Sequence, residues 1–158
     1  MEGKGKPLAT KTIAKNKKAY FDYEILEKYV TGIVLTGAEV KAIKGGHVQM
    51  KGSFAVIDRG RVMVENMHVS PYQYSIAAGY DPLRRRELLL RKKEIEYLAG
   101  QSSQKGFTLV PLEIFLKKGL IKVLLGICRG KQAHDKRQVL KGRAMEREIA
   151  QGLKKFTH

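Results

Sequence analysis

Apolar positions in the middle of the chain fall into short runs separated by glycines, and this pattern predicts mainly β structure. The apolar runs 54–57 and 62–64 flank the sequence DRGR, and a glycine-containing turn between two apolar runs is typical of a β-hairpin. The runs 107–116 and 120–128 flank the sequence KKG in the same way. We therefore expect two hairpins, one in each half of the chain.

The remaining patterns predict shorter strands and two helices. Loose alternation predicts a strand over 20–27, and a short apolar segment predicts another over 33–35. Apolar positions three residues apart predict a short helix over 38–44, and helical spacing predicts the main helix over 88–100. Gly45 follows the first segment and Gly100 ends the second, as expected at helix ends. The two prolines within 70–82 indicate a loop.

Many short strands joined by glycine-containing turns favour a small closed or partly open antiparallel β-barrel with a few helices. The expected barrel covers residues 16–130. Residues 1–15 are rich in Gly, Lys and Thr and predict a flexible basic arm. Residues 131–158 form a basic tail in which Met145, Ile149, Leu153 and Phe156 recur at helical spacing. Such a tail is expected to be disordered alone and to become helical on a partner, or to dock permanently as a terminal helix.

The charge of the chain indicates what kind of partner it binds. The 158 residues contain 31 Lys and Arg against 15 Asp and Glu, so the net charge is +16. Most of the excess lies in three clusters, at 15–18, 84–93 and 129–158. A solvated charged surface would explain one cluster, but three clusters together favour a polyanionic partner, and above all a nucleic acid.

Other classes of function find little support in the sequence. The chain has one cysteine, Cys128, so an intramolecular disulfide is impossible, and it has neither a membrane-spanning run nor a secretory signal. We therefore expect a cytoplasmic protein. It has no Walker loop and no His pair at helical metal-binding spacing, so we expect no cofactor and no metal. The pair His134-Asp135 leaves open a ribonuclease with His134 as general base, although no second catalytic group lies nearby in sequence.

Five motifs resemble one known family. Residues 16–19 (NKKA), 35–44 (LTGAEVKAIK), 81–90 (DPLRRRELLL), 110–112 (VPL) and 130–137 (GKQAHDKR) occur in the order and spacing of the small protein B family, the SsrA-binding proteins. Each motif alone is modest. All five together, spread from Asn16 to Arg137, make the resemblance specific.

The resemblance implies an OB-like antiparallel β-barrel with a few flanking helices. It also implies binding to the tRNA-like part of tmRNA and delivery of tmRNA to stalled ribosomes for trans-translation and peptide tagging. No catalytic residue is implied. The residues expected to bind RNA are Asn16, Lys17, Lys18, Glu39, Lys41, Lys44, Arg84, Arg86, Leu89 and Arg91.

The same resemblance assigns the tail to the ribosome, at the decoding site and the mRNA channel of the small subunit. The residues expected to contact the ribosome are His134, Asp135, Lys136, Arg137, Lys141, Arg143, Arg147, Leu153 and Lys154. We expect a monomer with no membrane partner. Two alternatives stay open: a basic ribosomal or other structured-RNA-binding protein, and the ribonuclease that uses His134.

Overall fold

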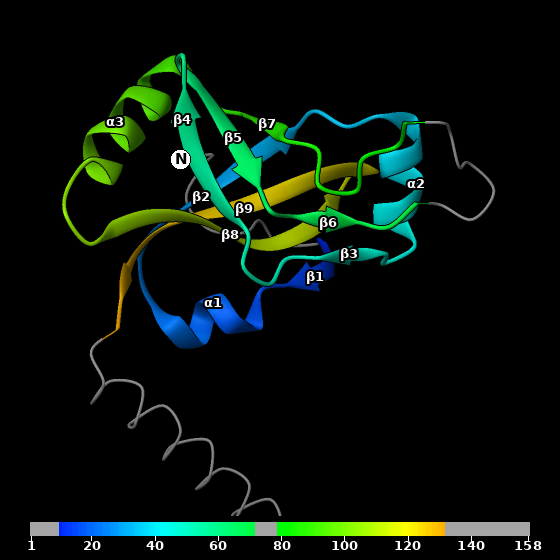
Figure 1. The fold of residues 1–158 in the computed structure, drawn as a ribbon, viewed down its shortest axis with the longest axis horizontal. Coiled ribbons are helices and arrows are strands. Elements are labelled where there is room, and N and C mark those ends of the chain that lie inside the picture. Colours follow the sequence, from blue (N-terminus) through cyan, green and yellow to red (C-terminus); the bar gives the residue numbers. More distant parts are fainter. Residues whose placement is uncertain (1–9, 72–78, 132–158) are drawn as a thin grey trace, which may run out of the picture.

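A computed structural model describes residues 10–71 and 79–131 (Figure 1). Three helices and nine strands make up this part of the chain. The helices are α1 (Lys17–Asp22), α2 (Gly37–Lys44) and α3 (Lys92–Ser102). The strands are β1 (Lys11–Lys15), β2 (Tyr23–Ile33), β3 (Val48–Gln49), β4 (Phe54–Asp58), β5 (Arg61–Glu65), β6 (His68–Val69), β7 (Arg86–Leu89), β8 (Phe107–Lys117) and β9 (Leu120–Gly130).

The main sheet is antiparallel and closes on itself. Its strands are ordered β1-β8-β4-β5-β7-β2-β9, and the additional pairing of β8 with β9 completes a ring. Along β8, Leu109 pairs with Ala55 of β4, whereas the segment 113–116 pairs with β1. One edge of β8 is thus shared by two strands. The ring confirms the predicted mainly β, OB-like barrel.

Two apolar clusters explain why β8 and β9 are almost uninterrupted apolar runs. The larger cluster fills the barrel and includes Leu109, Val123 and Ile127. The smaller one lies on the opposite face of the same strands and includes Leu124 and Cys128, with Ala19 of α1 packed on it. A strand that is buried on both faces loses the alternation typical of a half-exposed strand. Helix α1 therefore covers part of the outer surface of the barrel (Figure 1).

Both predicted hairpins are confirmed, as β4–β5 and β8–β9. Their turns use left-handed backbone, with φ of 52° at Arg59 and 75° at Gly60 in the first turn. The short helix expected over 38–44 is confirmed as α2. Thr36 caps it, because its side chain accepts from the Glu39 N–H while the Glu39 carboxylate accepts from the Thr36 N–H.

Two expected elements need correction. The segment 20–27 is not one strand, because helix α1 continues to Asp22 and β2 then runs without a break through Gly32 to Ile33. The segment 88–100 is not one helix, because β7 continues to Leu89 and α3 begins only at Lys92. In both places tertiary pairing and burial override a local pattern that did not separate a short helix from a strand.

The predicted boundaries of the arm also change. The last five residues of the segment expected to be a flexible arm form β1, which pairs with β8 and belongs to the sheet. At the other end, Lys131 is tied to the barrel, since its N–H donates to Asp22 O and its Nζ donates to Tyr20 O. Residues 1–9 and the rest of the predicted tail, 132–158, lie outside the described residues.

Candidate nucleic-acid interface

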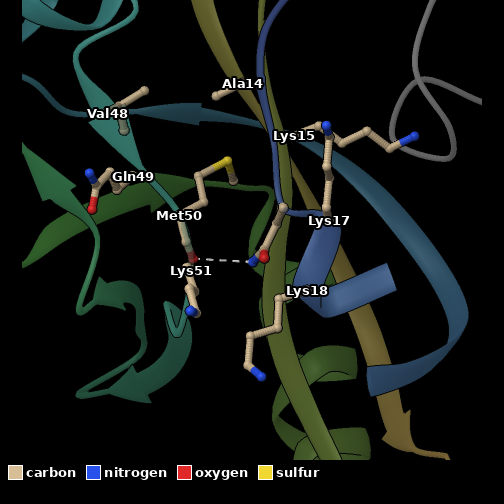
Figure 2. Close-up of a pocket in the computed structure, with 9 residues that line it drawn as sticks. Ala14, Lys15, Lys17, Lys18, Val48, Gln49, Met50 and Lys51 are labelled. Carbon is tan, nitrogen blue, oxygen red and sulfur yellow. Dashed lines mark hydrogen bonds between the residues drawn. The ribbon is translucent and has the colours of Figure 1, made fainter. Parts of the chain in front are cut away.

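A cleft of about 690 Å³ opens where β1 passes into α1 (Figure 2). One wall carries Lys15, Lys17 and Lys18, and the facing wall is the segment 48–51, which ends in Lys51. All four lysine side chains are exposed. Figure 2 shows Lys18 and Lys51 extending from these two facing segments. The fold thus gathers four amino groups around one opening.

Asn16 holds the two walls of this cleft together. Its Oδ1 accepts from Ala19 N–H at 3.2 Å, so it caps α1. Its Nδ2 donates to Met50 O at 3.2 Å, the dashed line in Figure 2, and to Pro111 O at 2.9 Å. The Asn16 backbone N–H also donates to Leu112 O. One side chain therefore links the start of α1 to β8 and to the segment that carries Lys51.

Of the four lysines, only Lys18 forms an ion pair with another residue of the described part of the chain. Lys18 forms an ion pair with Asp22, with Nζ and Oδ2 3.3 Å apart, yet 54% of its side chain stays exposed. The Lys15 amino group lies 4.7 Å from the centre of the Tyr20 ring. Ammonium groups on flexible stems suit phosphate oxygens as point charges. The cleft is therefore suited to a phosphate backbone.

A second basic cluster is built around a buried carboxylate. Glu39 is 1% exposed. Arg84 Nη2 lies 2.6 Å from its Oε1, and Arg86 Nε lies 2.5 Å from its Oε2. Burial alone would raise the pKa of Glu39, but hydrogen bonds from Arg84, from the Thr36 N–H and from Arg86 outweigh it and lower the pKa to about 2. Glu39 is therefore a carboxylate at neutral pH.

Arg86 lies deeper than Arg84. Its side chain is fully buried, and its guanidinium also donates to Met67 O at 2.8 Å and to Pro82 O at 3.2 Å. Arg84 keeps 39% of its side chain exposed. Arg86 and Glu39 thus have no surface to offer a ligand, and only Arg84 of this cluster reaches the surface.

These positions divide the ten expected RNA-binding residues into two groups. Asn16, Glu39 and Arg86 are 3%, 1% and 0% exposed and are bonded within the protein, so they present almost no surface in this structure. Arg84 is half-buried and the other six are exposed. These six are Lys17, Lys18, Lys41, Lys44, Leu89 and Arg91.

The exposed residues do not all lie together. Lys17 and Lys18 are in α1, whereas Lys41 and Lys44 are in α2, at a separate part of the barrel surface (Figure 1). Leu89, at the end of β7, has 52% of its side chain exposed, which is unusual for a large apolar residue in a sheet. The expected interface is therefore spread over several patches.

Sequence reasoning missed Lys51, which is an isolated lysine in the sequence and joins the cleft only through the fold. Tyr20 is half-buried, and its OH donates to Glu113 at 2.7 Å. All the expected ribosome contacts, from His134 onward, lie outside the described residues.

In residues 10–71 and 79–131, no group of three or more His, Cys, Asp or Glu residues could hold a metal ion. No helix in the same ranges is long and apolar enough to cross a membrane. Cys128 is buried, and this burial raises the pKa of its thiol to about 12.

A small closed antiparallel barrel with lysine-lined surface clefts is typical of nucleic-acid-binding proteins of the OB class. Residues 13–155 match the family model described as SmpB protein. The chain is 51% identical to the SsrA-binding protein of Bacillus cytotoxicus over 144 residues, which are 91% of this chain and 93% of that protein. It is 50% identical to the SsrA-binding protein of Bacillus subtilis, over 91% and 92% of the two chains.

A solved structure agrees with these matches. A chain of the structure described as "tmRNA-SmpB: a journey to the center of the bacterial ribosome" is 48% identical, with a TM-score of 0.65, and the match covers 76% of this chain and 85% of that one. The protein described here therefore belongs to the SmpB family of SsrA-binding proteins.

Proposed function

We propose that this protein binds the tRNA-like part of tmRNA and delivers tmRNA to stalled ribosomes, where the stalled peptide is tagged in trans-translation. Its membership of the SsrA-binding family and its likeness to a chain of the tmRNA-SmpB ribosome structure support this function. The single observation that carries it is the cleft lined by four exposed lysines from two separate segments of the chain. The function is recognition of RNA, and it requires no chemical step by this chain.

Direct contacts are assigned to exposed side chains only. Lysines at the cleft neutralise phosphates, Arg84 offers a partly exposed guanidinium, and Leu89 offers an apolar surface to a base or a ribose. Asn16, Glu39 and Arg86 act as positioning residues, because they hold the segments that carry these contacts. The residues proposed to touch tmRNA are Lys15, Lys17, Lys18, Lys41, Lys44, Lys51, Arg84, Leu89 and Arg91.

The tail is proposed to act on the ribosome and not on tmRNA. Nine Lys or Arg against three acidic residues in 129–158 suit ribosomal RNA, and the expected partners are the decoding site and the mRNA channel of the small subunit. The ribonuclease alternative depends on His134, for which no second catalytic group has been identified. We place the protein in the cytoplasm, where ribosomes translate.

A triple variant tests the cleft. Lys17→Ala/Lys18→Ala/Lys51→Ala removes three phosphate contacts, and gel-shift titration should show tmRNA binding at least about tenfold weaker. Each phosphate contact contributes about −0.7 to −0.9 to the log–log salt slope. We expect a slope steeper than roughly −3 for the wild type, and a slope about 2 units shallower for the triple variant.

A second triple variant provides the control. Changing Lys11, Lys92 and Lys93 to Ala removes the same charge from exposed positions that line no part of the cleft. Its tmRNA affinity should stay within about threefold of the wild type. Equal losses in the two triple variants would mean that only net charge matters, and the cleft would then not be the binding site.

A further inference from the structure

Two more clefts continue the lysine-lined cleft along the surface of the barrel. The middle cleft, of about 220 Å³, shares Asn16 and Lys18 with the first. The third cleft, of about 660 Å³, shares Tyr23 and Thr108 with the middle one. We call the three together the long groove. It leads from the start of α1, past the segment 52–54, to the end of β9.

Positive charge is present at both ends of the long groove. The first cleft has its four lysines, and the third has exposed Lys105 and exposed Arg129. The acidic residues near the groove are held in ion pairs: Asp22 in the middle cleft with Lys18, and Glu24 with Arg129. The two pairs also occupy Lys18 and Arg129, so the remaining positive charge of the groove lies at its two ends, on Lys15, Lys17 and Lys51 and on Lys105, where it attracts a chain of anions.

The middle of the groove offers rings and an unused hydroxyl. Phe54 is 38% exposed at the middle cleft, and the half-buried Tyr23 and Phe107 line the third cleft. Ser53, which is 4% exposed, also lines the middle cleft, and its Oγ has no hydrogen-bond partner among the described residues. A buried hydroxyl without a partner is destabilising, so a hydrogen bond from a polar group of a ligand would be stabilising there.

We propose that the long groove binds an unpaired RNA strand that extends from the first cleft, shared with the folded tRNA-like part of tmRNA, into the middle and third clefts. An unpaired RNA strand alternates phosphates with flat bases. The phosphates suit the cations at both ends of the groove, and the bases suit the aromatic rings between them. The middle cleft is smaller than the roughly 300 Å³ at which sites for drug-sized ligands begin, so it admits a group the size of one base. In a duplex the faces of the bases are already stacked on one another, so they do not stack on the aromatic rings of the groove. The chain's own basic tail has the wrong sign of charge to occupy the groove.

The probe is a labelled oligouridylate of about ten nucleotides, a length within the range that one OB fold covers. Fluorescence anisotropy with the full chain at about 0.15 M salt measures its affinity. Phe54→Ala should weaken binding about fivefold or more, since a stacking ring is lost. Lys105→Glu should weaken it about threefold or more. A hairpin duplex of equal length should be insensitive to Phe54→Ala.

Matched controls separate the groove from net charge and from folding. Lys93→Glu makes the same charge change in α3, and Leu120→Ala removes an apolar side chain that is 62% exposed on β9; neither residue lines the groove. Both controls should leave oligonucleotide affinity within about twofold. Weakening by Lys93→Glu equal to that by Lys105→Glu would overturn the proposal, and so would an acidic peptide that binds as tightly as the oligonucleotide and responds equally to Lys105→Glu.

Competition identifies which RNA supplies the strand. The bound oligonucleotide is displaced with tmRNA in one arm and with small-subunit ribosomal RNA in the other. If one of these RNAs displaces the oligonucleotide less effectively from Phe54→Ala than from the wild type, that RNA supplies the strand. The proposal is overturned if neither RNA shows such a loss. Loss of tmRNA binding in the lysine triple variant tests the proposed function separately, because Phe54 and Lys105 belong to none of its contacts.

Discussion

Neutralising Glu39 tests whether the buried cluster is a scaffold or a contact. Glu39→Gln keeps the shape of the side chain but leaves Arg86, whose side chain is fully buried, without its counterion. Removing one partner of a buried ion pair costs about 3–5 kcal/mol, because the remaining charge stays in the protein interior. Arg86 retains its bonds to Met67 O and Pro82 O, so we expect the lower end, about 3 kcal/mol.

The pH dependence of stability gives a second estimate of the same interaction. The pKa of Glu39 is lowered from 4.5 to about 2, so its contribution is fully present above pH 4.5 and is lost as the pH falls towards 2. A depression of that size corresponds to about 3 kcal/mol in total, and more than half of it is gone by pH 3. The two estimates therefore agree.

Urea unfolding at pH 7 and at pH 3 measures both quantities. The wild type should lose about 2 kcal/mol more than Glu39→Gln between the two pH values, because the variant has no carboxyl to titrate at this position. Glu96→Gln is the matched control, since Glu96 is exposed on α3. It should change stability by less than about 0.5 kcal/mol. A loss below about 1 kcal/mol in Glu39→Gln at pH 7, or equal pH dependence in variant and wild type, would refute the reasoning.

Three further predictions concern other parts of the molecule. Asn16→Ala removes a helix cap and the side-chain donor to Pro111 O and to Met50 O, which keeps the Ser53 N–H, so the free energy of unfolding should fall by about 2 kcal/mol or more, measured by urea unfolding. In Gly126→Ala the new Cβ would lie 2.7 Å from the buried Leu112 Cδ1, so thermal unfolding should show a loss of about 1–3 kcal/mol, while Gly130→Ala on the same strand meets nothing within 4 Å and should be nearly neutral. Deleting residues 140–158 should keep tmRNA affinity within about tenfold by gel shift yet abolish peptide tagging in reconstituted translation; loss of RNA binding would place the tail in the RNA site.

The parts of the fold that depend on neighbours in sequence were predictable. The hairpins β4–β5 and β8–β9 follow from apolar runs around glycine turns, and helix α2 carries its own capping box at Thr36 and Glu39. Helix α1 was missed because it has only six residues and is held by distant partners. Its cap, Asn16, bonds to carbonyls 34 and 95 positions away. Nothing in the local sequence records such contacts.

The sequence identified the motif residues of the candidate site, but it did not separate the exposed ones from the buried ones. A polar residue in an RNA-binding motif is expected to touch RNA, whereas Asn16, Glu39 and Arg86 are buried and bond to the protein. Lys51 shows the opposite case. It belongs to no motif, and it lines the lysine cleft because the fold places the segment 48–51 opposite the end of β1. A pattern indicates which positions matter, and burial decides whether they matter as contacts or as supports.

The buried polar residues explain how a surface with so much positive charge keeps a fixed structure. Lysines around one opening repel one another, so their positions must be imposed by the chain that carries them. Asn16 imposes the position of the first cleft through three neutral hydrogen bonds, which salt does not screen. The lysine contacts with RNA, in contrast, weaken with salt. Raising the salt concentration should therefore release RNA from the folded protein well before it loosens the cleft itself.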